Sequence, residues 1–411
     1  MSEEKSRRRS SIPTFLSGGQ YETQPEMLQV RQKPGKLFIG IPKEETLQEN
    51  RVALVPSSIA TLVGYGHRVV VESQAGEKSN FSDHDFAESR AEIVFSKEEV
   101  YKADIIIKVA PPTLEEIELM HSDQILISPL QLPIISAEYI NRLKQKRVVA
   151  LAMEYIKDES DNFPVVRIMS EMAGLSAVLT AGELLSIDGG GNGVLLGGIS
   201  GVPSAKIVIL GAGIVGENAT RVALGLGAEI RVFDNNIYKL KRLKNQIGQA
   251  IYTSVVNPIY LERELITADV VIGAIHSKSG RTPVIVDEDM VAKMKPGSVI
   301  IDVSIDQGGC FATSEVTSLD KPTFVKYDVI HYCVPNIASR IPRTASIAVS
   351  NILTPILLNA GNTASIEALL FNNLGLRHGV YTYKGCLCNE YLGHRFNIKS
   401  TNLDLLITSN I

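Results

Sequence analysis

The chain has 411 residues, which is more than one ordinary hydrophobic core accommodates and predicts two domains of roughly 150 to 200 residues. Hydrophobic residues make up 45% and charged residues 21%, so the composition excludes a disordered or fibrous chain. A net charge of −4 provides no basic surface for nucleic acid or for an anionic membrane, and we expect neither partner.

Residues 1–36 are predicted to form a disordered N-terminal arm. They carry the basic patch KSRRRSS with scattered Gly, Pro and Gln, and they lack sustained periodicity. The patch is not followed directly by the apolar region of a secretory signal. The apolar runs further along have strand length, and none approaches the ~20 residues of a membrane helix. With four cysteines and seven histidines in no metal-ligand spacing, we expect a reduced, cytoplasmic protein without a bound metal.

Short apolar runs alternate with amphipathic segments from residue 37 onward. The runs are rich in Val and Ile, and segments of helical length such as 56–66 and 136–146 separate them. Runs without strict alternation indicate strands that are buried on both faces of a parallel sheet. The predicted strands of this first α/β domain lie within 36–42, 68–73, 104–110, 125–130 and 148–155.

A long helix with small residues on one face is predicted over 169–187. The glycine-rich segment 188–206 follows, and it lacks the Lys-Ser/Thr ending of a phosphate loop, so we interpret it as a mobile loop or hairpin. A second α/β series has predicted strands within 206–211, 229–234, 269–275, 298–304 and 326–334. Helical patterns at 344–361 and 363–375 are expected to return to the first domain and to make it discontinuous.

The segment KIVILGAGIVGENATRVALGLGAEIRVFD carries the strongest motif. Gly211, Gly213 and Gly216 have the spacing G-x-G-x-x-G, directly after an apolar strand and at the start of a helix, which is the context of a dinucleotide-binding turn. Gly211 permits the tight turn, Gly213 lets the backbone approach a pyrophosphate, and Gly216 allows the helix to pack closely on the strand. A glycine turn without a ligand is the less favoured alternative.

Asp234 ends the second strand of this unit. A carboxylate at this distance from the glycines accepts hydrogen bonds from both ribose hydroxyls and repels a 2′-phosphate. Asn235 and Asn236 follow it, at positions where an enzyme for the phosphorylated cofactor more often has Arg. The predicted cofactor is therefore NAD.

Two acids lie at the carboxyl end of the strand in SVIIDVSIDQGGCF. Open α/β sheets bind their ligands at this end of the strands, and Asp306 precedes a Gln-Gly-Gly turn that lets the backbone come close to a ring. Asp302 lies inside the apolar run, and we interpret it as a structural acid that local N–H groups satisfy.

Two cations of the first domain are candidates for substrate binding. Lys108 ends the apolar run DIIIKVA, where it is either paired in the interior or exposed at a strand end. Arg51 precedes an apolar segment, and its guanidinium has the geometry for a bidentate grip on a carboxylate. The residues themselves do not decide whether Lys108 is buried or whether Arg51 binds a carboxylate.

From about residue 37 to 385 the sequence resembles the alanine dehydrogenase family, which is related to the NAD-binding subunit of proton-translocating transhydrogenase. The resemblance rests on GIPKEETLQENRVALVPSS, ADIIIKVAPP, MSEMAG, GVLLGGISGVPSAKIVILGAGIVG, MKPGSVIIDVSIDQGGCF and HYCVPNIASRIPRTAS. It implies oxidation of L-alanine by NAD to pyruvate and ammonium, in a homo-oligomer, most often a hexamer. Other family members hold a divalent ion near LLNAGNT through residues that this chain lacks, so no metal is carried over.

The resemblance also implies roles for individual residues. Arg51 would hold the substrate carboxylate, Lys108 would bind the substrate carbonyl or carboxylate, and Asp306 would orient water and ammonia at the reacting carbon. The residues that it places at the cofactor, besides the three glycines and Asp306, are Ser170, Ile214, Val215, Asp234, Lys239, Ile275, His276, Val303, Val334, Asn336 and Ile337.

Gln131 in PLQLP occupies the position of the histidine that relatives use as a proton shuttle. An amide does not titrate in the useful range, and general acid–base catalysis contributes about 10²–10⁴-fold. Three hypotheses follow. Lys108 with a lowered pKa, or Asp306, transfers the protons; the substrate is another small oxo or amino acid; or the protein binds NAD(H) without turnover, as a nucleotide sensor.

The predicted fold is two doubly wound α/β domains with parallel sheets, one of them a Rossmann NAD-binding domain, separated by a cleft. Residues 37–165 together with 345–411 form the predicted substrate domain, and residues 166–344 form the predicted NAD-binding domain. The small-molecule substrate is expected between them, where domain closure excludes water around hydride transfer.

Overall fold

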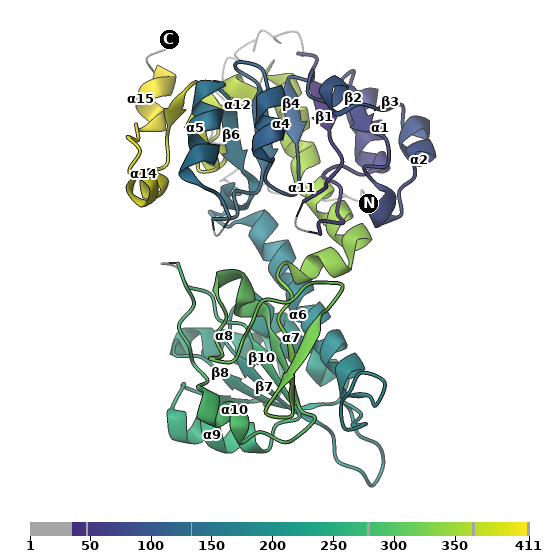
Figure 1. Ribbon diagram of the computed structural model, residues 1–411, viewed down its shortest axis with the longest axis vertical. Helices are drawn as coiled ribbons and strands as arrows, with labels where there is room; N and C mark the ends of the chain where they lie inside the picture. The colour runs from purple at the N-terminus through teal and green to yellow at the C-terminus, as the bar shows by residue number, and fades with distance from the viewer. Residues whose placement is uncertain (1–34, 47, 133, 278–279, 364–365, 409–411) are drawn as a thin grey trace, which may run out of the picture.

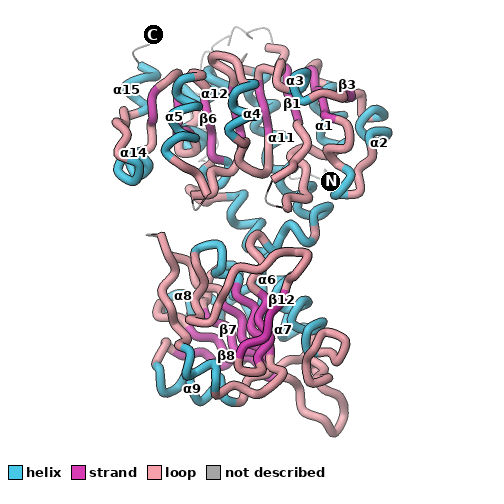
Figure 2. Tube along the Cα trace, in the orientation of Figure 1, coloured by secondary structure: helices cyan, strands magenta, loops and turns pink. Residues whose placement is uncertain are grey.

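The computed structural model describes residues 35–408, apart from 47, 133, 278–279 and 364–365. Most of the predicted N-terminal arm lies outside the described residues. Two sheets, each surrounded by helices, form the molecule, and Figure 2 shows their strands as two separate groups.

The first sheet has eight strands in the order β15-β14-β6-β5-β4-β1-β2-β3. From β6 to β3 all neighbours are parallel, whereas β14 pairs antiparallel with β6 and with β15. Its strands are β1 Phe38–Ile41, β2 Arg68–Glu72, β3 Glu92–Val94, β4 Ile105–Ile107, β5 Ile125–Ser128, β6 Val149–Ala152, β14 Val380–Tyr383 and β15 Cys386–Leu387. The helices of its first part are α1 Pro56–Gly64, α2 Asp83–Glu88, α3 Lys97–Val100, α4 Leu114–Leu119 and α5 Ala137–Gln145.

The second sheet has seven strands in the order β12-β13-β11-β10-β7-β8-β9, and only β12 is antiparallel to its neighbour. Its strands are β7 Lys206–Leu210, β8 Glu229–Phe233, β9 Tyr252–Ser254, β10 Val270–Gly273, β11 Val299–Asp302, β12 Thr323–Lys326 and β13 Val329–Tyr332. The helices between them are α7 Ile214–Gly225, α8 Ile237–Ile247, α9 Pro258–Ile266 and α10 Glu288–Ala292. The predicted fold class is confirmed, with the refinement that each sheet has an antiparallel edge.

Two long helices connect the sheets, α6 Pro164–Leu185 and α11 Pro342–Asn362. Val165 of α6 packs in the core of the first sheet, while Ala173 and Ala177 pack in the core of the second. Figure 1 shows α6 passing from one sheet to the other, whereas α11 begins between them and runs along the first sheet, in whose core its buried apolar residues pack. By length and composition alone α6 and α11 could cross a membrane, but half of the apolar window of each is buried, as in the core helix of a globular fold.

The last part of the chain returns to the first sheet. After α12 Ile366–Asn372 and α13 Leu374–Arg377, strands β14 and β15 extend the sheet beyond β6, and α14 Glu390–Phe396 and α15 Leu403–Thr408 follow. The sequence pattern predicted a helix over 363–375, where α12 and the start of α13 lie, but neither strand and neither of the last two helices. Thr382 is buried and donates from its hydroxyl to the carbonyl of Val148, so a polar residue occupies the middle of a core strand.

Three predicted segments differ in detail. The run 326–334 is not one strand, because Tyr327 and Asp328 both have left-handed φ, of 55° and 58°, and turn the chain between β12 and β13. The run 148–155 is a strand only to Ala152, and Met153–Tyr155 continues as a 3-10 turn. The segment 188–206 contains the predicted hairpin, with Ile199 paired to Val202.

Candidate active site

The predicted substrate residues follow the carboxyl ends of neighbouring strands in the first sheet. Lys108 comes directly after β4, and its N–H donates to the carbonyl of Ile127 in β5 at 2.9 Å. Gln131 lies in the loop after β5, and the segment with Arg51 follows β1, the neighbour of β4. Parallel strands end at the same edge of a sheet, so these side chains share one edge.

Lys108 is an interior cation. Its side chain is 1% exposed, and its Nζ lies 2.9 Å from Oε2 of Glu44 and 3.1 Å from Oε1 of Glu116. The exposed alternative is therefore wrong. Burial alone would lower the pKa of Lys108, but the attraction of the two carboxylates outweighs it and the pKa is raised. This contradicts the hypothesis that Lys108 with a lowered pKa shuttles protons.

Arg51 is buried and is held by Glu49, two residues earlier. Its Nε donates to Oε1 of Glu49 at 2.7 Å, and Nη2 donates to Oε2 at 2.6 Å. The bidentate edge of the guanidinium is thus already used. The other edge, formed by Nη1 and Nη2, has only the Met169 thioether, 3.1 Å from Nη1, as a further partner among the described residues. This second edge is therefore the part of Arg51 that is left for a further acceptor.

Asn336 joins the two domains at this point. Its Nδ2 donates to Oε2 of Glu49 at 3.0 Å, and its backbone N–H donates to Oδ1 of Asp306 at 2.9 Å. Arg51, Glu49, Asn336 and Asp306 consequently form one chain of contacts across the interface. Burial by itself would raise the pKa of Glu49. The charge and hydrogen bonds of Arg51, and then the hydrogen bond from Asn336, stabilise the carboxylate more strongly, so the pKa of Glu49 lies below its ordinary value.

Asp306 lies in the 3-10 segment Val303–Gln307 after β11. Solvent reaches its side chain, yet enough protein surrounds it that burial raises the pKa of Asp306 above its ordinary value. The Asn336 N–H and the charge of Arg51 act in the opposite direction. Exposure to solvent and a raised pKa are both compatible with the hypothesis that Asp306 exchanges protons.

Gln131 has an unusual backbone, with φ of 46° in the left-handed region. Its N–H and that of Leu130 lie 3.4 Å and 2.7 Å from Oε1 of Glu154. No hydrogen bond or ion pair within the described part of the chain joins Gln131 or Lys108 to Asp306. The predicted catalytic residues therefore share a region but form no single bonded cluster.

Two glycines of the turn lie so close to neighbouring backbone atoms that no side chain would fit. Gly211 has φ of 111°, and a Cβ there would lie 2.4 Å from the carbonyl oxygen of Ala274. A Cβ on Gly216 would lie 1.9 Å from the carbonyl oxygen of Gly211, so only glycine lets α7 start so close to β7. At Gly213, the N-cap of α7, the same direction is open space. Ile214 and Val215 form the first turn of α7.

Helix α6 packs against this turn. A Cβ on Gly174 would lie 2.4 Å from the carbonyl oxygen of Val215, so α6 and α7 touch through their backbones. Ser170 is one helical turn before Gly174 and hence lies on the same face of α6.

Asp234 directly follows β8 and is buried beside the turn. Its Oδ2 accepts from the Ala212 N–H at 2.8 Å and its Oδ1 from the Asn236 N–H at 2.7 Å. Lys239 Nζ lies 3.9 Å from Oδ2. Burial lowers the pKa of His276, and the charge of Lys239 lowers it further.

The remaining predicted cofactor residues lie on the loops after β10, β11 and β13. The Ile275 N–H donates to the Ser304 hydroxyl at 2.9 Å, next to Val303. Val334 and Ile337 are buried on either side of Asn336. The structural interpretation of Asp302 is confirmed, because its carboxylate accepts from the N–H groups of Ser304 and Cys310 and from the Ser314 hydroxyl.

Models of both domains of one family match the chain. The "Alanine dehydrogenase/PNT, N-terminal domain" matches residues 40–173, and the "Alanine dehydrogenase/PNT, C-terminal domain" matches residues 177–390. The chain belongs to the alanine dehydrogenase/PNT family.

Relatives of this family member cover nearly its whole length. It is 38% identical over 367 residues to alanine dehydrogenase 2 of Staphylococcus aureus (strain USA300), which covers 89% of the chain and 98% of the relative. A solved L-alanine dehydrogenase superposes with a TM-score of 0.82 at 35% identity, and the match covers 87% of this chain and 99% of the chain of that structure. A transhydrogenase from Sinorhizobium meliloti, at 24% identity and a TM-score of 0.73, covers 86% and 99% and shares the fold.

Four carboxylates of the site were absent from the sequence prediction. Glu44 and Glu49 lie in the same motif as Arg51, Glu116 lies on α4, and Glu154 follows β6. The apolar run around Glu154 predicted a strand to residue 155, so the 3-10 turn that contains Glu154 was not predicted. An acid inside an otherwise apolar run was the available signal.

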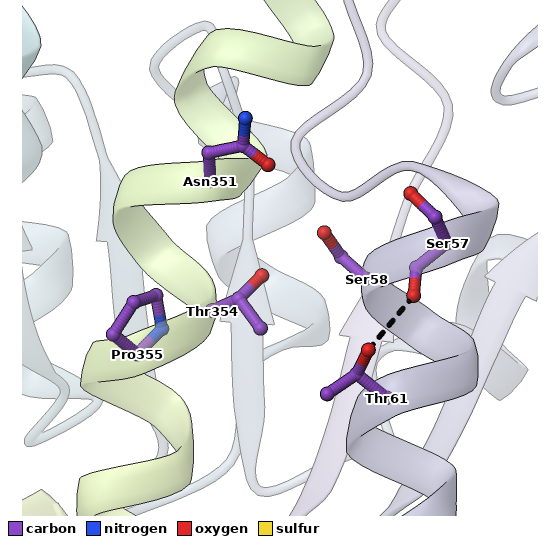
Figure 3. A pocket seen from close by; sticks show the side chains of 6 residues that line it. All are labelled: Ser57, Ser58, Thr61, Asn351, Thr354 and Pro355. Atoms are coloured by element: carbon purple, nitrogen blue, oxygen red, sulfur yellow. Dashed lines mark hydrogen bonds between the residues drawn. The ribbon is translucent and has the colours of Figure 1, made fainter.

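A cavity of about 340 Å³ lies elsewhere in this alanine dehydrogenase/PNT member, between α1 and α11 (Figure 3). It contains none of the predicted site residues and is lined by Ser57, Ser58, Thr61, Asn351, Thr354 and Pro355. Within the described ranges, no group of three or more His, Cys, Asp or Glu side chains could hold a metal ion.

Proposed function

We propose that the protein is an NAD-dependent amino-acid dehydrogenase that converts L-alanine, NAD and water to pyruvate, ammonium and NADH. The carrying observation is the chain of contacts from Arg51 through Glu49 and Asn336 to Asp306, because it sets a carboxylate-binding cation beside an acid of the nucleotide-binding half. Family membership and the 38% identity to an alanine dehydrogenase support the reaction.

The glycine turn and Asp234 would hold NAD. Gly213 leaves open space at the N-terminus of α7, where free N–H groups favour a pyrophosphate, and the buried Asp234 carboxylate has lone pairs left for ribose hydroxyls. The predicted residues on α6 and on the loops after β10, β11 and β13 would line the nicotinamide. The bound nicotinamide would supply the hydride acceptor.

The site residues of both sheets would orient and activate the amino acid. Arg51 would bind the substrate carboxylate at its Nη1 and Nη2 edge. Lys108, held charged between Glu44 and Glu116, would donate its remaining N–H to the substrate carbonyl or carboxylate. Asp306 accepts a proton from the water that attacks the iminium carbon and returns a proton to the leaving amine. Closing the domains would exclude bulk water from these steps.

Residues 37–165 with 345–411 would form the substrate domain, and 166–344 the NAD-binding domain. The segment after α6 exposes Leu195, Ile199 and Val202, and exposed apolar side chains gathered on one segment support assembly with further copies of the chain. We include a cytoplasmic homo-oligomer, a hexamer by resemblance, in the proposal. Light scattering on a variant with serine at these three positions tests it, since the proposal expects smaller particles.

The alternative function is an NAD(H)-binding protein with impaired or altered activity, and Gln131 is the observation that favours it. Purified protein with L-alanine and NAD in alkaline buffer should produce NADH absorbance. No absorbance, together with a higher melting temperature in NAD, would support the binding module instead.

The variant Q131H separates a weakened dehydrogenase from a changed substrate. A gain of about 10²-fold or more with alanine would show that an imidazole restores the missing acid–base group. A loss with alanine would show that the amide serves a different small oxo or amino acid, which a panel of such acids would identify.

A further inference from the structure

Glu154 is an acid that the reaction scheme above does not use. It follows β6, whose last residue Ala152 pairs with Ser128 at the end of β5, and so it lies next to the loop that contains Gln131. Its Oε1 accepts from two consecutive N–H groups of that loop, Leu130 at 2.7 Å and Gln131 at 3.4 Å. With a strand spacing of about 5 Å, β6 is roughly 10 Å from β4, the strand that Lys108 follows.

These hydrogen bonds act on a backbone that needs support. Gln131 has φ of 46°, in the left-handed region that non-glycine residues other than Asn and Asp seldom adopt. The Ile134 N–H donates to the carbonyl of Gln131 at 3.1 Å and closes the turn. An acceptor on the two N–H groups before that carbonyl therefore stabilises the left-handed backbone conformation of residue 131, from which its side chain starts.

The second carboxylate oxygen of Glu154, Oε2, is buried and is not compensated by a hydrogen bond within the described residues. The titratable groups that interact with the carboxyl are the phenols of Tyr139 on α5, the adjacent Tyr155 and Tyr381 on β14. Within the described ranges no cation affects its pKa. Glu44 and Glu49, by contrast, each face a buried cation.

Burial raises the pKa of Glu154 to about 6, although the N–H groups of Leu130 and Gln131 lower it. The group therefore changes charge in a range in which an ordinary glutamate is fully ionised. A neutral carboxyl accepts the two N–H bonds less strongly than a carboxylate does.

We propose that Glu154 is the positioning residue for Gln131: its carboxylate holds residue 131 in the left-handed turn, and uptake of one proton from solvent releases it. The carboxylate gains the proton and loses its negative charge, and no other bond changes. The inference rests on the proposed function, since the placement of Gln131 affects turnover only if residue 131 belongs to the active site.

Two measurements on the full-length protein test this. The first is the pH profile of kcat/KM for alanine in the wild type, in E154Q and in the control E171Q, which removes a partly exposed carboxylate of α6 that pairs with Arg167. We expect an acid limb with a midpoint near 6 in the wild type and E171Q. E154Q should show no such limb, a KM about 3- to 10-fold higher at neutral pH, and an unchanged Kd for NAD.

The second measurement is hydrogen exchange, by mass spectrometry, of the peptide that contains residues 125–139. Protection at Leu130 and Gln131 should decrease in E154Q, and in the wild type as the pH falls through 6. An acid limb that persists in E154Q with the same midpoint, or equal protection in both proteins, overturns the proposal.

If the wild type turns over neither alanine nor pyruvate with ammonium, the proposed function fails. Hydrogen exchange then decides the inference alone. Lost protection in E154Q retains Glu154 as the positioning residue of this loop, and unchanged protection removes it.

Discussion

The side chain of Asn336 donates to Oε2 of Glu49 at 3.0 Å, so one amide of the nucleotide-binding half binds the acid that holds Arg51. The same residue has φ of 53°, and its N–H binds Asp306. Asn tolerates this left-handed conformation better than most residues. An asparagine at position 336 therefore both adopts the positive φ and supplies the side-chain donor to Glu49.

Replacing Asn336 should separate these two properties. N336G keeps the backbone free to adopt positive φ but loses the contact with Glu49, and we expect a loss of about 1 kcal/mol in stability. N336A adds a strained backbone of about 1 kcal/mol more. Urea unfolding of both variants measures the difference, and equal stabilities would show that the backbone is not strained.

The Lys108 cluster should respond to the loss of its cation. K108M leaves Glu44 buried without a positive partner and Glu116 with Lys97, 3.8 Å away, as its remaining partner, and breaking a buried pair in this way costs about 3–5 kcal/mol. The defect should shrink as the pH is lowered, because the carboxyls then take up protons. Denaturation of wild type and K108M at pH 7.5 and at pH 5 checks this, and a pH-independent defect would contradict it.

Asp234 should determine the choice of cofactor. D234G with N235R removes the charge that repels a 2′-phosphate and supplies a cation for it. We expect NAD to bind at least tenfold more weakly and NADP to bind more tightly than in the wild type. Calorimetry with each cofactor measures both, and N235R alone serves as the control because it retains Asp234.

Glu154 should give the fold a distinct pH dependence. Its pKa is raised to about 6 in the fold from 4.5, so between these values the folded state binds more protons than the unfolded state. The stabilisation is therefore complete below pH 4.5 and is lost as the pH rises through 6, by roughly 2 kcal/mol at most. Subtracting the stability curve of E154Q from that of the wild type isolates this loss, because the other carboxyls titrate in both.

The sequence by itself determined the elements whose signal is local. Apolar runs gave the central strands, and G-x-G-x-x-G between a strand and a helix gave the nucleotide turn, because φ and close backbone contact restrict Gly211 and Gly216 to glycine. The motif residues Arg51, Lys108 and Asp306 were found in the same way, by charge at the ends of apolar runs.

Only the tertiary structure decided how these charges are used. Whether Lys108 is exposed depends on Glu44 and Glu116, and the orientation of Arg51 depends on Glu49. The support of Gln131 by Glu154 joins residues that are 23 positions apart, on adjacent strand ends. Hydrogen bonds and ion pairs act over a few ångströms in space, so no local pattern specifies them, and strands β14 and β15 join the first sheet for the same reason.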